Sequence, residues 1–261
     1  MPPAPAFRRT WVALGLLACM SGLAPAHAAD RVPLAGTSPA PLNRHSSVAS
    51  LLTGDIVSID TTLVTCSAVA TFSDVDGGAT PGTNYDGVLS SGGLLFSERF
   101  DGQSLSASAD FDVVSGVASN PLQPLAGEAG QNLDVFDFAG NALTGLGPIG
   151  FPDIDAIGEG SIAIYFSAAQ SKVKFLLLGG NGGTATLSFY RRDGSLIDEL
   201  VVSDLADLAY AFGTADDSYS IAGILIQNTD ASGIGIDDIC YDQAPVSVRP
   251  LTWGSLKRRY R

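Results

Sequence analysis

The chain has 261 residues, of which 27 are acidic and 14 basic, and its formal net charge is −13. This balance disfavours nucleic acid and anionic lipid as partners, because the basic patch that such partners require is missing. Only two His and three Cys occur in the whole sequence, so most catalytic triads and zinc sites lack the side chains that they need.

The N-terminal residues have the composition of an export signal. Arg8 and Arg9 precede an apolar run, and a stretch of small residues ends at Ala26-His27-Ala28. This order predicts a secretory signal peptide over residues 1–28, whose apolar run is shorter than the ~20 residues that cross a bilayer. A lipoprotein site at Cys19 and a twin-arginine signal are the alternatives. We therefore expect a protein that is secreted or periplasmic, at the exterior of a bacterial cell, without a transmembrane segment.

Three further regions follow the predicted signal peptide. Residues 29–54 are rich in Pro, Ser and Ala and have no periodicity, which predicts a flexible leader. Residues 55–243 have the alternating pattern of strands and form the predicted folded domain. Residues 244–261 form a basic C-terminal tail, which is either a docking signal or a solvated end.

Within the folded domain, strand-length segments alternate with Gly, Asn and Asp. The first apolar, β-branched run, over residues 56–72, predicts a strand pair or one long strand. Asp193-Gly194 predicts the tight turn of a hairpin over residues 184–202. Residues 205–212 are predicted as a loop that runs into a strand. The other predicted strands, in chain order, cover residues 94–100, 105–114, 133–138, 162–166, 173–178, 185–190, 196–202, 221–227 and 234–241.

Short strands, Gly-rich turns and the absence of long helical patterns predict the fold class. An all-β chain of this kind buries its apolar faces by packing two antiparallel sheets together. We expect one antiparallel β-sandwich domain, jelly-roll-like.

Two cysteines, Cys66 and Cys240, remain after the predicted cleavage and lie near the two ends of the folded domain. An even pair in an oxidising compartment predicts a disulfide, with two buried free thiols as the alternative. The one remaining histidine, His45, lies in the predicted leader, so a Ser-His-Asp arrangement has no ordered base.

Several segments resemble exported bacterial β-sandwich proteins of the PEP-CTERM-associated type, which are similar in turn to jelly-roll carbohydrate-binding modules. The resemblance implies a fold more than a function, and residues 244–261 depart from the group because they contain no Pro-Glu-Pro and no apolar span. The segments that carry it are residues 82–89, 96–103, 156–161, 189–197 and 228–239.

A calcium site is predicted near the end of the domain. Asp237 and Asp238 are adjacent on the predicted last strand, so their side chains point to opposite faces. Asp238 would then lie on the apolar face unless a bulge, a hydrogen-bond network or a cation satisfies it. The resemblance places Asp237 at the ligand position of a structural calcium.

Calcium suits this chain because it takes carboxylate and carbonyl oxygens and needs no His or Cys. Asp74 and Asp76, in an early turn, are candidates for further ligands. The alternative is that these aspartates cap neighbouring backbone amides.

Exposed aromatic side chains beside polar groups would indicate a sugar site. Tyr85, Tyr210 and Tyr219 are the candidates, and the last two fall in loop-like stretches. Aromatic residues at alternate strand positions more often belong to a core, which is the alternative.

Glycosidases need only two acids at a suitable separation, so carboxylates remain possible catalysts. The candidates are Glu98, Glu128, Asp155 and Glu159, although scattered carboxylates in an acidic protein are usually solvated loop residues. We therefore expect a secreted, non-catalytic binding module for extracellular polysaccharide or another cell-surface component. The alternatives are a structural or adhesive surface protein without a sugar site and, third, a glycosidase or lyase.

Overall fold

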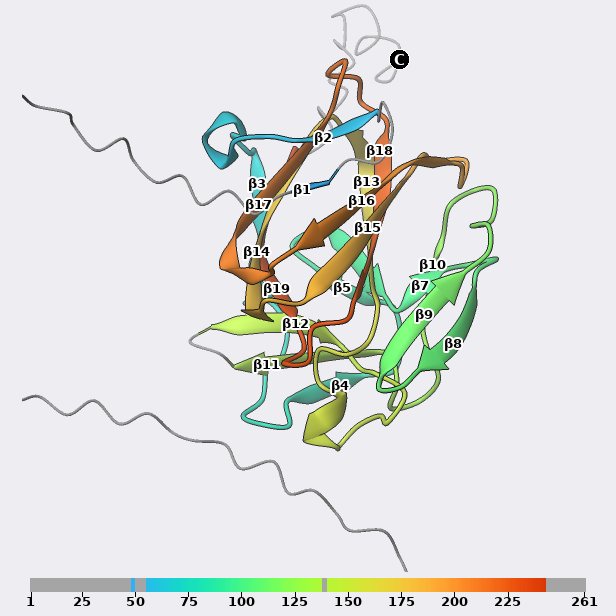
Figure 1. Ribbon diagram of the computed structural model, residues 1–261, viewed down its shortest axis with the longest axis vertical. Helices are drawn as coiled ribbons and strands as arrows, with labels where there is room; N and C mark the ends of the chain where they lie inside the picture. Colours follow the sequence, from blue (N-terminus) through green and yellow to red (C-terminus); the bar gives the residue numbers. More distant parts are fainter. Residues whose placement is uncertain (1–47, 50–54, 138–139, 243–261) are drawn as a thin grey trace, which may run out of the picture. The chain divides into compact units, whose positions relative to one another are not determined.

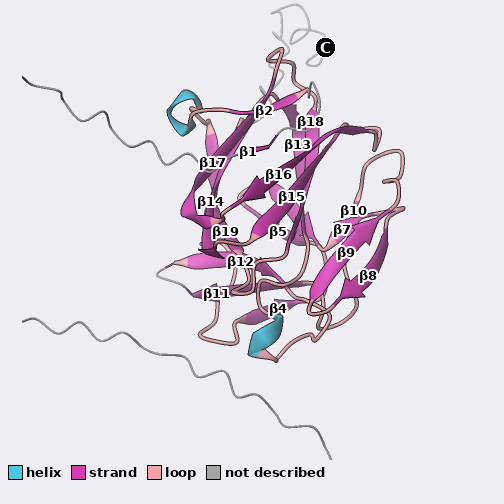
Figure 2. Cartoon of the chain, in the orientation of Figure 1, coloured by secondary structure: helices cyan, strands magenta, loops and turns pink. Residues whose placement is uncertain are grey.

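The computed structural model describes residues 48–49, 55–137 and 140–242. Contacts along the chain separate residues 1–43 from residues 44–261, and all described residues belong to the second unit. The predicted signal peptide, Cys19, His45, most of the leader and the predicted tail lie outside the described residues. Within the described ranges the chain consists of β-strands, loops and two short 3-10 helices, η1 (Thr61–Leu63) and η2 (Ile154–Ala156) (Figure 1; Figure 2). None of the helices found there has the length and apolar character needed to cross a membrane.

Two antiparallel sheets contain most of the strands. The first sheet has the order β1 (Val48–Ala49), β16 (Leu196–Ser203), β15 (Thr184–Tyr190), β18 (Ile221–Asn228), β13 (Ile162–Gln170), β6 (Leu94–Ser97), β5 (Leu89–Ser91). The second sheet has the order β2 (Ile56–Ser58), β17 (Ala206–Thr214), β14 (Lys172–Asn181), β19 (Gly235–Tyr241), β12 (Asn141–Gly145), β11 (Leu133–Asp137), β4 (Thr83–Tyr85), and β3 (Ala68–Ala70) also pairs with β19. Two strand pairs lie outside these sheets: β7 (Arg99–Phe100) with β10 (Pro124–Leu125), and β8 (Ser104–Ser108) with β9 (Phe111–Ser115).

The eight strands from β12 to β19 have jelly-roll topology. The first sheet contains them in the order β16-β15-β18-β13, and the second in the order β17-β14-β19-β12. Successive strands change sheets at every step except within the β15–β16 hairpin, which is the pattern of a double Greek key. The predicted fold class, an all-β antiparallel sandwich of jelly-roll type, is confirmed.

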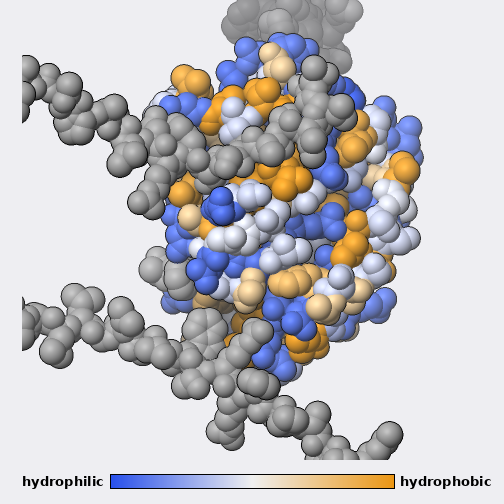
Figure 3. All heavy atoms as spheres, viewed as in Figure 1, coloured by the Kyte–Doolittle hydropathy of each residue, from blue (hydrophilic) through white to orange (hydrophobic). Residues whose placement is uncertain are grey.

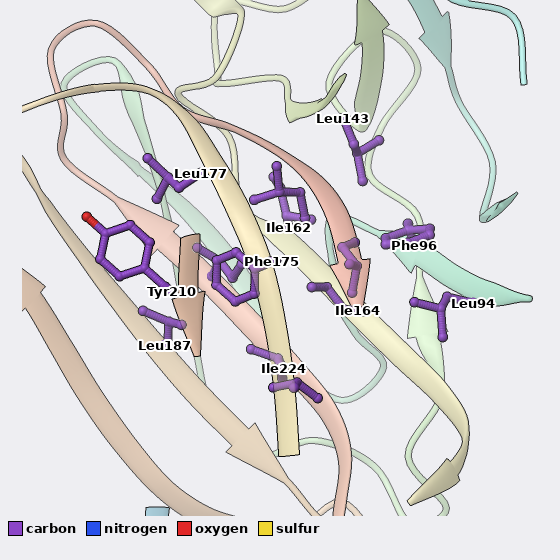
Figure 4. Close-up of a cluster of buried hydrophobic side chains, with 14 of the residues drawn as sticks. Leu94, Phe96, Leu143, Ile162, Ile164, Phe175, Leu177, Leu187, Tyr210 and Ile224 are labelled. Atoms are coloured by element: carbon purple, nitrogen blue, oxygen red, sulfur yellow. The ribbon is translucent and has the colours of Figure 1, made fainter. Parts of the chain in front are cut away.

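The main core lies between the two sheets. Strand β14 shows how the sequence produces it: Val173, Phe175 and Leu177 are buried, whereas Lys172 and Lys174 alternate with them and are partly exposed. Figure 4 shows the side chains of Phe175 and Leu177 packed among residues from strands of both sheets.

A second apolar cluster covers the other face of the first sheet. Phe100 and Leu122 pack there against Ala222 and Leu225 of β18. Because β18 is buried on both faces, its sequence is an almost continuous run of apolar residues, without the alternation of apolar and polar residues that a half-exposed strand shows. Gly223 lies in the middle of that run, where a Cβ would come within 2.6 Å of the Phe100 ring.

The β15–β16 hairpin confirms the prediction made from Asp193-Gly194. Gly194 has a φ of 80°, and its N–H donates to the carbonyl of Arg191 at 3.0 Å. The backbone N–H of Ser195 also donates to Asp193 Oδ1 at 3.0 Å. Gly is favoured at this position because it adopts positive φ without steric cost.

Several elements of the structure differ from the prediction. The run over 56–72 contains two short strands separated by η1, instead of a strand pair or one long strand, and the segment 105–114 is a hairpin that reverses at Ala109, whose φ is 55°. Residues 206–214 are strand throughout, because β17 pairs with β14 and β2. Strand β12 was not predicted; its Asn- and Gly-containing sequence is held by β11 and β19 on either side.

The predicted disulfide joins Cys66 and Cys240, whose Cα atoms are 5.3 Å apart. Cys240 packs in a small cluster with Val64 and Ala211, on the face of the second sheet that points away from the main core. The bond therefore fastens the segment that follows η1 to the last strand of the domain.

Replacing both Cys66 and Cys240 by Ser should lower the free energy of unfolding by about 2–5 kcal/mol, because the unfolded chain loses a cross-link that closes a long loop. Chemical denaturation of the oxidised wild-type and the double variant measures the difference. As a control, a reducing agent should destabilise the wild-type and leave the variant unchanged. Equal stability of the two oxidised proteins would contradict a stabilising role for the bond.

Candidate functional site

A hollow of about 180 Å³ lies where the two ends of the described domain meet. Its wall is formed by residues 63–65 beside η1, residues 171–172 at the start of β14, Tyr219 in the β17–β18 loop, and residues 241–242 at the end of β19. Segments from four separate parts of the sequence therefore form one concave surface.

Two apolar side chains at this hollow are exposed to solvent. Tyr219 is 66% exposed and Leu63 is 64% exposed. Lys172 lines the same wall, and its ammonium group forms an ion pair with the Asp217 carboxylate at 2.9 Å. An exposed aromatic ring beside charged groups is an arrangement that can stack on an apolar ring face while hydrogen-bonding its edge.

The loop that carries Tyr219 is held by local hydrogen bonds. The Thr214 hydroxyl donates to the Ser218 carbonyl at 2.9 Å, and the Ser218 N–H donates to Asp216 Oδ1 at 3.0 Å. These bonds hold the backbone directly before Tyr219.

The opposite wall is held by the last described residue. The Asp242 N–H donates to Gln170 Oε1 at 2.7 Å, and Gln170 Nε2 donates back to the Asp242 carbonyl at 2.9 Å. Asp242 Oδ1 accepts a further hydrogen bond from the Ser67 N–H at 3.3 Å. The Tyr241 hydroxyl donates to the carbonyl of Gly92, in the β5–β6 turn.

Of the three predicted sugar-stacking tyrosines, the structure places only Tyr219 at this hollow. Tyr210 is 7% exposed and packs in the main core, where Figure 4 shows it beside Leu177, Phe175 and Leu187. The prediction that it is a loop aromatic is corrected, because β17 begins at Ala206 and turns this side chain inward. Tyr85 is partly buried, and its hydroxyl donates to the carbonyl of Asp76 at 2.8 Å.

The predicted calcium ligand Asp238 lies in a β-bulge. The Cα partners across β14 and β19 are Leu176 with Asp237 and then Lys174 with Cys240, so β19 has one extra residue. Asp238 has a φ of 49° and is exposed, and its N–H donates to Asp237 Oδ1 at 2.7 Å. The bulge is what keeps Asp238 off the apolar face.

The other predicted ligands, Asp74 and Asp76, are exposed in the loop after β3. The Asp74 carboxylate accepts hydrogen bonds from the Ser91 hydroxyl and from the Gly92 N–H, the latter at 2.9 Å. These bonds hold the pKa of Asp74 below its usual value. In the described ranges, no three His, Cys, Asp or Glu side chains are grouped so that they could hold one metal ion. Calcium binding by the four predicted aspartates stays a prediction.

The predicted catalytic carboxylates occupy different environments. Glu98 is fully buried beside Asp112, which is 5% exposed, and Glu98 is paired with Arg99. Burial raises the pKa of Glu98 to about 7; the Asp112 charge adds to the rise and Arg99 opposes it. Glu128 is exposed, although its charge also raises the pKa of Glu98. Asp155 is exposed in η2, and Glu159 is 6% exposed.

The Asp112 carboxylate has a structural role in this pair. Its Oδ2 accepts a hydrogen bond from the Ser161 N–H at 3.0 Å, and the Ser161 hydroxyl donates to the Glu98 carbonyl at 2.8 Å. These bonds connect β9, β13 and the segment between β6 and β7. The pair is thus enclosed within the folded domain.

Three buried aspartates were missed at the level of sequence. Asp112 and Asp134 each interrupt an apolar strand, which is a signal that a charged side chain has been buried for a reason. Asp230 is 1% exposed; its Oδ2 accepts from the N–H groups of Asn181 and Gly183 at 2.7 and 2.9 Å. Asp230 thereby joins the β14–β15 turn to the β18–β19 loop.

Stability should fall as the pH rises from about 4 to about 7. Burial raises the pKa of Glu98 and Asp134 to about 7 and that of Asp112 and Asp237 to about 6. In the unfolded chain these groups titrate near pH 4, so within this window the folded protein binds more protons than the unfolded one. Thermal melts in chelator should therefore show a Tm that decreases with pH and levels off above about pH 7. An increase in Tm across the same window would contradict this explanation.

Comparisons with known proteins complete the description of the site. No protein-family model matches the chain, and no curated protein or solved structure matches it either. The resemblance to exported β-sandwich proteins of the PEP-CTERM-associated type stays a prediction. The fold and the candidate site are described from this chain's own residues.

Proposed function

We propose that the chain is a non-catalytic binding module for extracellular polysaccharide, and that the hollow beside Tyr219 is its ligand site. The observation that carries the proposal is the exposure of Tyr219 and Leu63 at a concave surface with an ion pair beside it. Sugar rings combine an apolar face with hydroxyl groups around the edge, so they suit an aromatic platform beside polar and charged groups.

The size of the hollow favours part of a polymer over a compact ligand. Its volume of about 180 Å³ is below the ~300–1,000 Å³ typical of sites that enclose a drug-sized molecule. A polysaccharide would place one ring in the hollow and extend over the neighbouring surface. Repetition of such weak contacts along a polymer raises the overall affinity.

The proposed location of the protein is the cell exterior. The Cys66–Cys240 disulfide supports this location, because such bonds persist mainly in oxidising compartments. The predicted signal peptide, which lies outside the described residues, points in the same direction.

A structural or adhesive protein without a sugar site is the alternative, and two observations weigh against it. The outermost strands of both sheets, β1, β5, β2 and β4, have at most three residues each as described, which limits pairing with a strand of another protein. On the face that Figure 3 shows, hydrophobic residues are distributed among polar ones instead of forming one flat patch. An extended protein-binding surface would be expected to gather them.

A glycosidase or lyase is the third hypothesis. It requires two carboxylates facing a cleft, about 5–10 Å apart. The Asp112 charge helps to raise the pKa of Glu98, but both carboxyl groups are enclosed. Among the described residues that line the hollow beside Tyr219, Asp242 is the carboxylate.

Replacing Tyr219 by Ala should lower the affinity for the bound polysaccharide at least about tenfold, because the stacking surface is removed. Tyr219→Phe keeps the ring and should retain most of the affinity. The measurement is retention of the purified chain on a panel of insoluble and soluble polysaccharides, with released products monitored.

Val117→Ala is the matched control, because Val117 is 80% exposed and lies in the β9–β10 connection, outside the hollow. It should bind like the wild-type. If no polysaccharide retains the wild-type chain, the proposal is wrong and the structural alternative gains support. Release of shortened sugars would support the enzyme hypothesis.

A further inference from the structure

Three polar side chains form a row across β4, β11 and β12. Asn84 is the register partner of Asp134, and Asp134 is the register partner of Thr144. The neighbours of Asp134 along β11, Leu133 and Val135, belong to the main core. Since side chains alternate along a strand, the row lies on the face of the second sheet that points away from that core. Directly opposed residues have Cβ atoms about 4.5–5.5 Å apart, so the oxygens of this row can approach one point.

The Asp134 carboxylate is enclosed, and no donor in the described part of the chain forms a hydrogen bond of ordinary geometry with it. The residue is 0% exposed, and neither Oδ1 nor Oδ2 has such a partner there; only the neighbouring Val135 N–H interacts with the carboxylate and slightly opposes the rise of its pKa. The Oδ1 atom of Asn84 is likewise buried without a donor, because the amide directs its Nδ2 to Asp86 Oδ1 at 2.7 Å. The Thr144 hydroxyl has only a long hydrogen bond, 3.4 Å, to the Asp134 carbonyl. Three acceptor oxygens are thus buried together without a matching positive group.

The backbone of Gly82 closes this site. A Cβ at residue 82 would overlap the Asp134 carboxylate, and the φ of Gly82 is 101°. Only glycine allows the main chain to pass this close to the carboxylate. The backbone of the fold thus encloses the carboxylate. Because water is excluded, an ionised Asp134 without a positive partner would destabilise the folded state.

We propose that the row Asn84–Asp134–Thr144 binds a hard divalent cation, calcium. Calcium accepts carboxylate, amide and hydroxyl oxygens in irregular geometry and can take both oxygens of one carboxylate, whereas magnesium demands a near-octahedral set. Asp134 supplies the negative charge, and Asn84 and Thr144 supply neutral oxygens. The remaining ligands are backbone carbonyls or water. With a single carboxylate, the expected dissociation constant is on the order of 10⁻⁴–10⁻³ M, the range of extracellular modules.

This site is separate from the aspartates predicted from the sequence. Asp237 lies on the same face of the second sheet but two strands away, across β12, which corresponds to about 10 Å. The inference does not rest on the proposed sugar site either, because none of the three residues lines the hollow beside Tyr219.

The test is a calcium titration of the thermal melting of the full chain, after removal of bound metal with a chelator. The wild-type Tm should rise with calcium and saturate in the millimolar range, because a ligand that binds only the folded state stabilises it. Asp134→Asn should abolish the rise, and this variant should still fold because it removes a buried charge. Asp237→Asn, the matched control on the same face, should keep the rise.

A second variant should strengthen calcium binding, in contrast to Asp134→Asn, which should abolish it. Asn84→Asp adds a carboxylate to the row and should lower the dissociation constant for calcium at least about tenfold, because calcium affinity increases with the charge of its ligands. The same variant should melt at a lower temperature than the wild-type in chelator. These opposite changes distinguish a ligand from a residue that merely supports the fold.

Terbium provides an optical probe of the position of the ion. Tyr85 follows Asn84 in β4 and is the register partner of Leu133, so its ring can sensitise terbium bound at this row. Tyr85→Phe should reduce terbium emission while keeping the calcium-dependent rise in Tm. Calcium should displace terbium from the wild-type, and Asp134→Asn should give no emission above background.

Three outcomes would overturn the proposal. The first is a wild-type Tm that does not respond to calcium, and the second is a response that persists in Asp134→Asn. The third is a response that Asp237→Asn abolishes, which would assign the ion to the other position. If calcium has no effect and the decrease in Tm with pH becomes smaller in Asp134→Asn, a proton neutralises the carboxyl group and no cation binds there.

Discussion

Burial of the centre of the first sheet on both faces is the constraint on which the rest of the structure depends. Its inner face packs against the second sheet, and its outer face is covered by Phe100, Leu122 and the neighbouring segments. Strand β18 can be almost entirely apolar only because both faces are covered. Gly223 of β18 leaves the space that the Phe100 ring occupies. The close contact between this glycine and the ring therefore allows the segment that contains Phe100 to pack on the first sheet.

The distribution of acidic groups follows from this packing. Most carboxylates of this acidic chain lie at the surface, but a few are placed where strands and loops must be joined. Asp230 and Asp112 accept backbone N–H groups from distant segments, and each thereby replaces hydrogen bonds to water with hydrogen bonds inside the protein. Asp134 is also enclosed, but no N–H group of a distant segment in the described ranges donates to its carboxylate. In this respect it differs from Asp230 and Asp112.

Much of the fold follows from local sequence patterns. The Asp193-Gly194 turn was sufficient to predict a hairpin, and the apolar residues 173–178 were sufficient to predict a strand. Strand β12 was not predicted, because its Asn, Ala and Gly residues are uncommon in strands and one of the two strands that hold it, β19, comes from a distant segment of the chain. The hairpin of β8 and β9 was predicted as one strand, because Ala109 is not a residue type that signals a turn.

The candidate sites were less predictable than the fold, for a physical reason. Tyr219 could be recognised as a loop aromatic, but its neighbours Leu63 and Lys172 come from segments that only the folded chain brings together. Asp134 could be recognised as a charge within an apolar strand, whereas its enclosure depends on Gly82, a residue 52 positions earlier in the sequence. Contacts between distant segments leave no periodic pattern in one sequence.

The central position of β19 also determines when the protein can fold. This last strand lies between β14 and β12, also pairs with β3, and carries Cys240. Until it has been synthesised, the second sheet consists of two halves without a common partner, and the disulfide has only one of its sulfur atoms. Most pairings join residues far apart in the sequence, so loop closure must precede the stabilising contacts. The contacts that β19 makes therefore connect the two halves of the second sheet and complete the disulfide in one step of folding.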